Sequence, residues 1–476
     1  MLTRRGFLAG AAPAVLRGTR RRPPNIVFVL IDDMGWRDVG YNGSRFYETP
    51  HIDRLAGDGM RFTNGYASAP VCSPTRAALM TGKHPARLGL TRHLQGAHRF
   101  HYSRVIPPPS RLELPLEEVT LAEMLHTAGY RSAAIGKWHL GDTGFLASDQ
   151  GFDVGVGGDT AGSTNSFFYP EWKKKIPLEG ARDGEYLTDR LTGLSLEFMR
   201  ESAGKPFFLY LPHFAVHVPI QAKAEYIPRY EKKVRAGDPQ NYPTYAAMVQ
   251  SVDESVGRVR GLLDELKLAG DTIVVFTSDN GGVSSREWQN RPVTSNLPLR
   301  AGKGHLYEGG IRVPTVVHYP GVTRAGSVCE EPVSTIDFAP TLTGAVGLGA
   351  KALPRMDGLD LRPLLEGKPR LERDRLYWHF PHYSPQLGLP SAAVRERDWK
   401  LIRFFEDGRE ELFNLRDDLG ETRDLARQQS DVRQRLSAQL TAWLKETGAL
   451  LPVQNSNYDP AREREAGAPM GPVPPK

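Results

Sequence analysis

Residues 25–33 read NIVFVLIDD, an apolar and β-branched run that ends in two adjacent aspartates. Three runs of the same kind follow at wide spacing: RSAAIG (131–136), PFFLYL (206–211) and DTIVVFTS (271–278). Strands that are apolar along their whole length are typical of a sheet that is covered on both faces. The sequence therefore predicts an α/β fold with a mostly parallel central sheet sandwiched by helices.

The segments between and after these runs complete the expected architecture. Residues 121–130 and 244–270 have apolar residues at helical spacing, and residues 430–448 predict an amphipathic helix. From residue 376 onward the chain changes to short alternating strands with turns. We therefore expect the following units: an export signal over 1–22, a catalytic domain over 23–370, a smaller C-terminal α+β subdomain with an antiparallel sheet and one helix over 371–452, and an extended or disordered tail over 453–476.

Composition narrows the class of protein. The chain has 476 residues, 40% hydrophobic and 24% charged, as in a soluble globular protein. Its net charge of +6 is spread along the chain, which predicts no nucleic-acid partner. Arg4-Arg5 before a short apolar run resembles a twin-arginine signal, so we expect a periplasmic or extracellular protein. That run is too short to span a bilayer, so no membrane anchor is expected in the mature form.

Polar side chains follow each of the four strands at the point where the strand ends. Asp32 and Asp33 follow the first strand, and Asp279 and Asn280 follow the fourth. Because ligands of open α/β sheets bind at the carboxyl ends of strands, we expect these groups to share one site. Oxygen ligands without histidine or thiolate select Ca²⁺ or Mg²⁺, so the sequence predicts a hard cation there.

One of only two cysteines, Cys72, lies in the stretch VCSPTRAALMTGK (71–83). Ser73 and Pro74 predict a helix start, with Ser73 as the N-cap. Residue 72 would then lie at a helix N-terminus, which favours a thiolate or a bound anion. The alternative is a buried and inert cysteine.

The segment Cys72-Ser73-Pro74-Thr75-Arg76 resembles the signature of the type I sulfatases, in which a formylglycine-generating enzyme oxidises the cysteine to Cα-formylglycine. The resemblance covers about residues 24 to 430. The family's other segments are matched in order by Asp32-Asp33, GKWHLG (136–141), FAVHVP (214–219, with Val216 where proline is usual), TSDNGG (277–282) and GKGHLYEGG (302–310). It implies an alkaline phosphatase-like fold, hydrolysis of a sulfate ester, and a Ca²⁺ ion held by Asp32, Asp33, Asp279, Asn280 and the modified residue 72.

The resemblance also implies the catalytic roles. The hydrated aldehyde at position 72 would attack sulfur, with Asp33 as the base, and His139 would take a proton when sulfate leaves. His217 and Lys303 are placed near the leaving oxygen, with His217 as the better proton donor. Arg76 and Lys137 are expected to neutralise the sulfate.

Loop residues provide the candidates for substrate contact. We expect His93, Ser163, His213 and His382 to line the pocket, although a structural role for His213 and interdomain packing around His382 are equally open. The resemblance is to the arylsulfatase A and N-acetylgalactosamine sulfatase branch, which implies a sulfated galactose or N-acetylgalactosamine unit in preference to a simple aryl sulfate.

Two other functions remain as alternatives. The same superfamily fold supports hydrolysis of phosphoesters and phosphonate monoesters. A non-catalytic glycan-binding relative would be expected to lack the cysteine or the metal carboxylates, and this chain has both.

Overall fold

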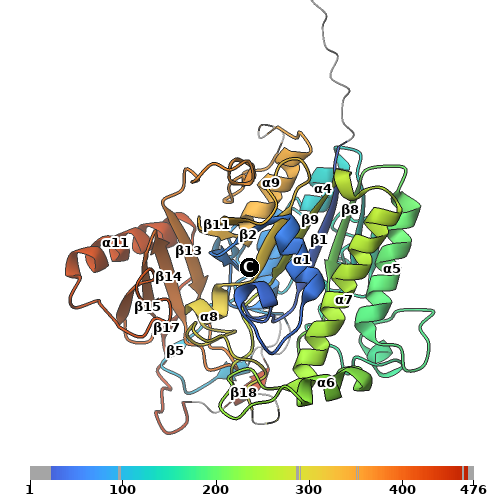
Figure 1. The fold of residues 1–476 in the computed structure, drawn as a ribbon. Helices are drawn as coiled ribbons and strands as arrows, with labels where there is room; N and C mark the ends of the chain where they lie inside the picture. Colours follow the sequence, from blue (N-terminus) through green and yellow to red (C-terminus); the bar gives the residue numbers. More distant parts are fainter. Residues whose placement is uncertain are drawn as a thin grey trace, which may run out of the picture.

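The computed structural model describes residues 23–94, 98–285, 289, 291–349, 351, 353–463 and 466–469. Within these residues the centre is an eight-stranded sheet with the strands β1 Asn25–Ile31, β2 Met60–Phe62, β6 Arg131–Ile135, β7 Val154–Val156, β8 Phe207–Pro212, β9 Thr272–Ser278, β10 Thr315–His318 and β11 Ser327–Cys329. The order across the sheet is β11-β2-β10-β9-β1-β8-β6-β7 (Figure 1). Only β10 among them runs antiparallel to its neighbours, so the predicted mostly parallel sheet is confirmed.

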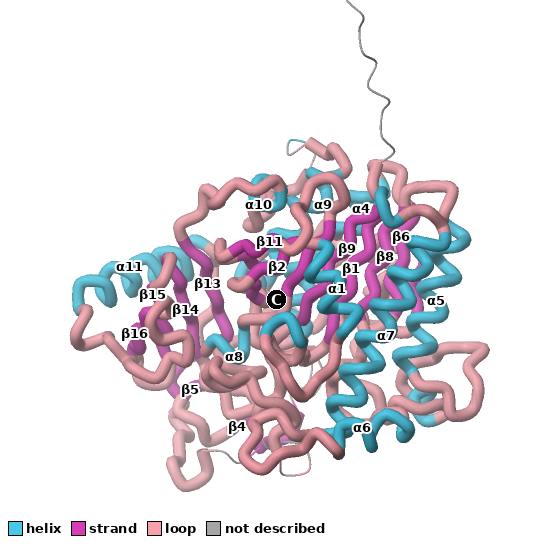
Figure 2. The backbone as a smooth tube through the Cα atoms, in the orientation of Figure 1, coloured by secondary structure: helices cyan, strands magenta, loops and turns pink. Residues whose placement is uncertain are grey.

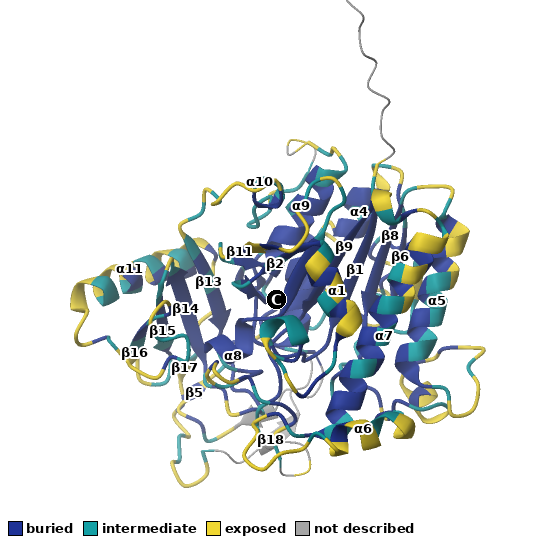
Figure 3. Ribbon diagram, viewed as in Figure 1, coloured by how far each residue is buried: buried dark blue, intermediate teal, exposed yellow. Residues whose placement is uncertain are grey.

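Alternate residues of β1 enter two different hydrophobic layers. Val27, Val29 and Ile31 pack in the layer formed by α1 Pro50–Asp58, α5 Leu187–Ser202 and α7 Pro243–Glu265. The residues between them pack in the layer formed by α2 Cys72–Thr81, α4 Leu121–His126 and α9 Phe338–Ala345. Burial on both faces explains why the strand is apolar throughout, and Figure 3 shows the sheet buried between helices whose outer sides are exposed.

The C-terminal subdomain is an antiparallel sheet covered by one helix, as predicted (Figure 2). Its elements are β13 Arg375–Phe380, β14 Ser391–Glu396, β15 Trp399–Phe404, β16 Glu410–Asn414 and α11 Ser430–Glu446. Leu436, Leu440 and Leu444 of α11 cover one face of this sheet. The other face packs against Tyr66 and Ile311 of the large domain, which fixes the subdomain beside the carboxyl edge of the central sheet.

The tail pairs with a loop of the large domain. β17 Val453–Gln454 is antiparallel to β5 Val105–Ile106, and β18 Ala466–Pro469 is antiparallel to β4 His98–Phe100. Two short parts of the described tail are therefore paired strands, and the described residues between them include several turns. The expected signal over residues 1–22 lies outside the described residues.

Some element ends differ from the predictions. The helix expected over 121–130 ends at His126, and that expected over 244–270 ends at Glu265. The prediction of Ser73 as an N-cap is wrong, because α2 begins at Cys72 after the extended residue Val71.

None of the helices in the described chain has the length and apolarity that crossing a membrane requires. The remaining elements are η1 Gly40–Asn42, β3 Gly65–Tyr66, α3 Pro85–Leu88, η2 Glu171–Lys174, η3 Ala224–Tyr226, α6 Ile227–Glu231, η4 Ala269–Asp271, α8 Glu308–Ile311, β12 Val333–Ser334, η5 Thr335–Asp337 and α10 Arg362–Leu365.

Candidate active site

The carboxyl ends of β1 and β9 bring the acidic residues together. The two strands are adjacent and parallel, with Ile31 opposite Ser278, so the residues that follow them lie side by side. The backbone N–H of Asp33 donates to Asp279 Oδ1 at 3.2 Å, and Asn280 Nδ2 donates to Asp33 Oδ1 at 2.8 Å. The site forms where the sequence places it, at one edge of the sheet.

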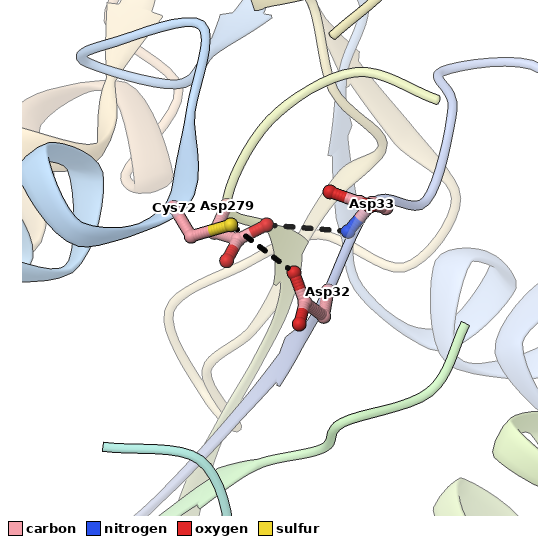
Figure 4. Close-up of side chains that lie close together, drawn as sticks. All are labelled: Asp32, Asp33, Cys72 and Asp279. Carbon is pink, nitrogen blue, oxygen red and sulfur yellow. Dashed lines mark hydrogen bonds between the residues drawn. The ribbon is translucent and has the colours of Figure 1, made fainter. Parts of the chain in front are cut away.

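Three carboxylates and one thiol form a buried cluster (Figure 4). One ligand atom each from Asp32, Asp33, Asp279 and Cys72 lies within 4.8 Å of the others. Asn280 Oδ1 is buried and, among the described residues, has no hydrogen-bond partner. A set of oxygen atoms with an unsatisfied amide oxygen beside it fits a hard divalent cation such as Ca²⁺ or Mg²⁺.

Burial and neighbouring charges separate the two adjacent aspartates. Burial, with the nearby Asp279 and Asp33, raises the pKa of Asp32 to about 7 although Lys137 opposes it. Burial acts the same way on Asp33, but Lys303 and His217 outweigh it and lower the pKa of that carboxyl below its usual value. The crowding of three carboxylates is what a bound cation would relieve.

Cys72 is the first residue of α2 and is only 2% exposed. Its Sγ lies 3.5 Å from Asp32 Oδ1. Burial and the charge of Asp32 raise the pKa of the thiol well above its ordinary value. Burial and the charge of Asp32 therefore disfavour the thiolate form of Cys72 at this helix N-terminus.

Two cations lie beneath the cluster. Arg76 donates from Nε to Asp279 Oδ2 at 2.9 Å and from Nη1 to the carbonyl of Lys137 at 2.6 Å, and its Nη2 lies 2.8 Å from Asp279 Oδ2 as an ion pair. Lys137 Nζ lies 2.5 Å from Asp32 Oδ2, and both of these basic side chains are fully buried. They hold the carboxylates in a fixed geometry and supply positive charge at the base of the site.

Lys303 and His217 both contact Asp33. Lys303 Nζ lies 2.8 Å from the carboxylate and His217 Nε2 lies 3.5 Å from it. Burial and then Lys303 lower the pKa of His217 to about 3, whereas Asp33 raises the pKa of Lys303 above its usual value despite burial. Both side chains therefore lie beside the same carboxylate, and the expectation that His217 is the better proton donor at the leaving oxygen stays a prediction.

His139 is held at the opposite side in one tautomer. Its Nε2 lies 2.8 Å from the carbonyl oxygen of Leu94, which requires the proton on Nε2. Its Nδ1 is buried and has no hydrogen-bond partner in the described part of the chain. Asp33 and His139 both have positive φ values, 62° and 58°, a backbone conformation that costs energy and occurs at functional sites.

Two of the four residues expected at the substrate pocket, His93 and Ser163, lie near His139. His93 is half-buried, and burial is the main cause that lowers the pKa of His139 and of His382, with a smaller contribution from His93 to each. His382 Nε2 lies 2.8 Å from Thr91 Oγ1. Ser163 follows Gly162, where a Cβ would come 2.7 Å from the His139 ring.

The expectation that His213 lines the pocket is not supported. Its side chain is fully buried and its Nε2 lies 3.0 Å from Ser255 Oγ of α7. Burial lowers its pKa to about 3. His213 therefore has the structural role that was left open. Leu94 was not predicted as a functional residue, although its backbone carbonyl orients His139. Every residue type has such a carbonyl, so the sequence does not indicate which residue makes this contact.

The fold and the site together define an enzyme of the alkaline phosphatase superfamily: a mostly parallel sheet with a buried cluster of metal-binding oxygens next to a helix N-terminus. The Sulfatase family model matches residues 24–348, and a model of the N-sulphoglucosamine sulphohydrolase C-terminal region matches residues 301–447. The chain belongs to the sulfatase family, as the resemblance indicated, and is a sulfuric ester hydrolase.

Similar proteins agree with this assignment. A sulfatase of Formosa agariphila is 32% identical over 90% of this chain and 89% of its own length. The N-acetylgalactosamine-6-sulfatase of Sus scrofa is 36% identical over 73% of this chain and 67% of its own length. The crystal structure of Ps i-CgsB in complex with k-i-k-neocarrahexaose superposes with a TM-score of 0.77 at 30% identity, covering 92% of this chain and 95% of that one.

Proposed function

We propose that this sulfatase removes sulfate from a carbohydrate of the galactose or N-acetylgalactosamine type, with Cys72 converted to formylglycine and one Ca²⁺ bound beside it. The observation that carries the proposal is the approach of Cys72 Sγ to three carboxylates within 4.8 Å at the sheet edge. The names of the related N-acetylgalactosamine-6-sulfatase and of the carbohydrate complex support the substrate class.

Asp32, Asp33, Asp279 and Asn280 would hold the cation, with the oxygen of the modified residue 72 completing the site. The described cluster has three carboxylates and three basic side chains, Arg76, Lys137 and Lys303, in contact with them. Their formal charges cancel, so a divalent cation leaves the site with an excess charge of two. That excess suits an anionic sulfate ester, because buried positive charge binds and stabilises it.

Formylglycine at position 72 would supply, as its hydrate, one hydroxyl as the nucleophile toward sulfur and a second hydroxyl for the release of sulfate. Asp33 accepts the first proton, since its carboxylate is kept ionised by Lys303. His139 accepts the second at Nδ1, the ring nitrogen left free by the Leu94 contact. Lys303 and His217 stabilise the departing alcohol oxygen from the other side.

The test combines the mass of the peptide that contains residue 72 with turnover rates for a panel of substrates. The peptide that contains residue 72 should be lighter than its thiol form by the replacement of SH and H with a carbonyl oxygen, and Cys72→Ala should abolish turnover. Sulfated galactose and N-acetylgalactosamine units should be better substrates than nitrophenyl phosphate or a phosphonate monoester. Faster turnover of a phosphorus ester, or wild-type activity of Cys72→Ala, would contradict the proposal.

We further propose that a twin-arginine signal exports the protein to the periplasm or the cell exterior. Arg4-Arg5 and the following apolar run support it. Twin-arginine cargo crosses the membrane folded, so residue 72 would be converted in the cytoplasm. Retention of an Arg4→Lys, Arg5→Lys variant in the cytoplasm is the expected result, and its normal export would contradict this localisation.

A further inference from the structure

The C-terminal segment 453–463, here called the clasp, is hydrogen-bonded to a loop that extends to the active site. The loop comprises residues 91–106, of which 91–94 and 98–106 are described. Beyond the β17–β5 pairing, Asp459 N–H donates to the carbonyl of Tyr102 at 3.1 Å, and Ser103 Oγ donates to the carbonyl of Glu463 at 2.9 Å. The β18–β4 pairing ties a later part of the tail to the same loop.

Asn455 makes the densest set of these contacts. Its Nδ2 donates to the carbonyls of His101 and Ser103 at 2.8 and 2.7 Å, and its backbone N–H donates to the carbonyl oxygen of Arg104 at 2.9 Å. Its Oδ1 accepts from the N–H of Asn457 at 3.0 Å. Asn455 is 9% exposed and Ser103 is fully buried, so these bonds satisfy backbone groups that water does not reach freely.

The inner end of the loop contacts the catalytic residues. Leu94 N–H donates to Ser73 Oγ at 3.0 Å, next to Cys72, and the Leu94 carbonyl accepts from His139 Nε2 at 2.8 Å. Leu94 is only 2% exposed. One residue of the loop therefore lies over the helix N-terminus and also fixes the tautomer of the imidazole.

We propose that the clasp is a positioning element for the active site and that Asn455 is its key residue, which holds residues 101–104 of the loop in place and so keeps Leu94 in contact with Ser73 and His139. Its catalytic consequence rests on the proposed function, because His139 acts there as a base. The loop has only two short strands in its described part, β4 and β5, and both pair with the tail. Such a loop loses much conformational entropy when it is ordered, and the clasp bonds offset that loss.

Asn455→Asp tests the proposal with a nearly isosteric change. It removes both Nδ2 donors and turns a carboxylate oxygen toward carbonyl oxygens in a buried position. Asn457→Asp is the matched control: it makes the same chemical change two residues later, at an exposed side chain with no hydrogen bond in the described structure. A chain that ends at Pro452 removes the whole clasp and is the second variant.

The first measurement needs neither formylglycine nor substrate. In unconverted protein, N-ethylmaleimide should alkylate Cys72 at least about tenfold faster in Asn455→Asp and in the shortened chain than in the wild type or Asn457→Asp. Cys329, in the edge strand β11 of the central sheet, with which neither strand of the loop pairs, is the internal reference and should keep its rate. An unchanged rate at Cys72, or equal acceleration at both cysteines, would overturn the proposal.

The second measurement separates positioning from substrate contact. With converted enzyme and nitrophenyl sulfate, Asn455→Asp should lower kcat by about tenfold and leave KM within about twofold, since misplaced catalytic groups slow the reaction without weakening binding. Asn457→Asp should match the wild type. An effect confined to KM for sulfated oligosaccharides would show that the loop is a wall of the substrate site, and the positioning role would be wrong. Loss of the proposed sulfatase activity in the wild type would leave the alkylation result intact.

Discussion

Lys400→Met should destabilise the protein strongly, because Lys400 is the cation shared by two buried carboxylates where the subdomain meets the large domain. Lys400 Nζ donates to Glu308 Oε1 at 2.8 Å and to Glu421 Oε1 at 2.9 Å, and all three side chains are fully buried. Arg312 still pairs with Glu308 in the variant. Glu421 keeps only the backbone N–H of Glu308, at 2.7 Å.

The size of the effect follows from these contacts. Two charge-assisted hydrogen bonds disappear, each worth about 1.5–3 kcal/mol. Removing one partner of a buried ion pair typically costs about 3–5 kcal/mol, because the remaining charge stays uncompensated. We therefore expect the free energy of unfolding to fall by about 3–5 kcal/mol at pH 8.

The loss should depend on pH. Burial and Glu308 raise the pKa of Glu421 to about 7 from its ordinary 4.5, although Lys400 opposes them. The folded protein thus binds this proton more tightly than the unfolded chain does, so the associated stability is complete below about pH 4.5 and is lost as the pH rises through 7. Without Lys400 the pKa of Glu421 rises further, and the variant should be less impaired at pH 5 than at pH 8.

Urea denaturation followed by tryptophan fluorescence measures the effect at both pH values. Lys232→Met is the control: Lys232 is exposed, with no side-chain hydrogen bond or ion pair in the described structure, and its removal should change stability by less than about 0.5 kcal/mol. The double variant Lys400→Met, Glu421→Gln should recover part of the loss, since it removes the uncompensated charge. A loss below about 1 kcal/mol, or an equal loss at both pH values, would refute this account of the network.

Three further predictions concern the active site. Gly162→Ala should lower kcat by about tenfold or more, because the new Cβ would come 2.7 Å from Cε1 of His139 and displace the imidazole. Steady-state kinetics of a variant whose metal content is unchanged measure this effect. A kcat equal to that of the wild type would contradict the prediction. Chelation of Ca²⁺ should lower the melting temperature, since a cation present at 100 times its Kd adds about 2.7 kcal/mol to the free energy of unfolding. Elemental analysis of the Asp279→Asn variant should show that most of the ion is lost. Full retention of the ion would show that Asp279 is not a ligand. His382→Ala should raise KM for a sulfated sugar more than for nitrophenyl sulfate, and equal changes would place His382 outside the sugar site.

The sequence predicted the elements that local pattern determines. The runs 25–31 and 272–278 became β1 and β9 because every residue in them is buried between two helical layers. The same pattern predicted the cluster of acidic residues, since parallel neighbours end at one edge of the sheet. Asp32 and Asp279 are far apart in the chain, yet only the strand ends had to be recognised to bring them together.

Contacts between segments that are far apart in the chain could not be predicted from local sequence patterns. His213 was ambiguous because its partner Ser255 lies on a helix 42 residues later, and nothing near His213 indicates that contact. Asn455 lies in a tail rich in proline, asparagine and arginine, a composition that fits an ordered strap and a disordered end equally well. Its partners His101 and Ser103 are more than 350 residues away, and the pairing exists only in the folded chain.

The segment from Lys303 to Glu308 joins two buried ionic clusters that are balanced differently. At its end, Glu308 accepts from Lys400, Arg312 and Tyr66, so that cluster is satisfied within the protein. At its beginning, Lys303 meets a cluster in which the Asn280 Oδ1 and His139 Nδ1 atoms have no partner among the described residues. A satisfied network fixes a backbone in place, whereas unsatisfied buried atoms are costly unless a ligand or ion completes them. The first cluster can therefore hold the segment rigid while Lys303 faces the second, where the proposed cation and sulfate ester would supply partners for the atoms that the protein leaves unpaired.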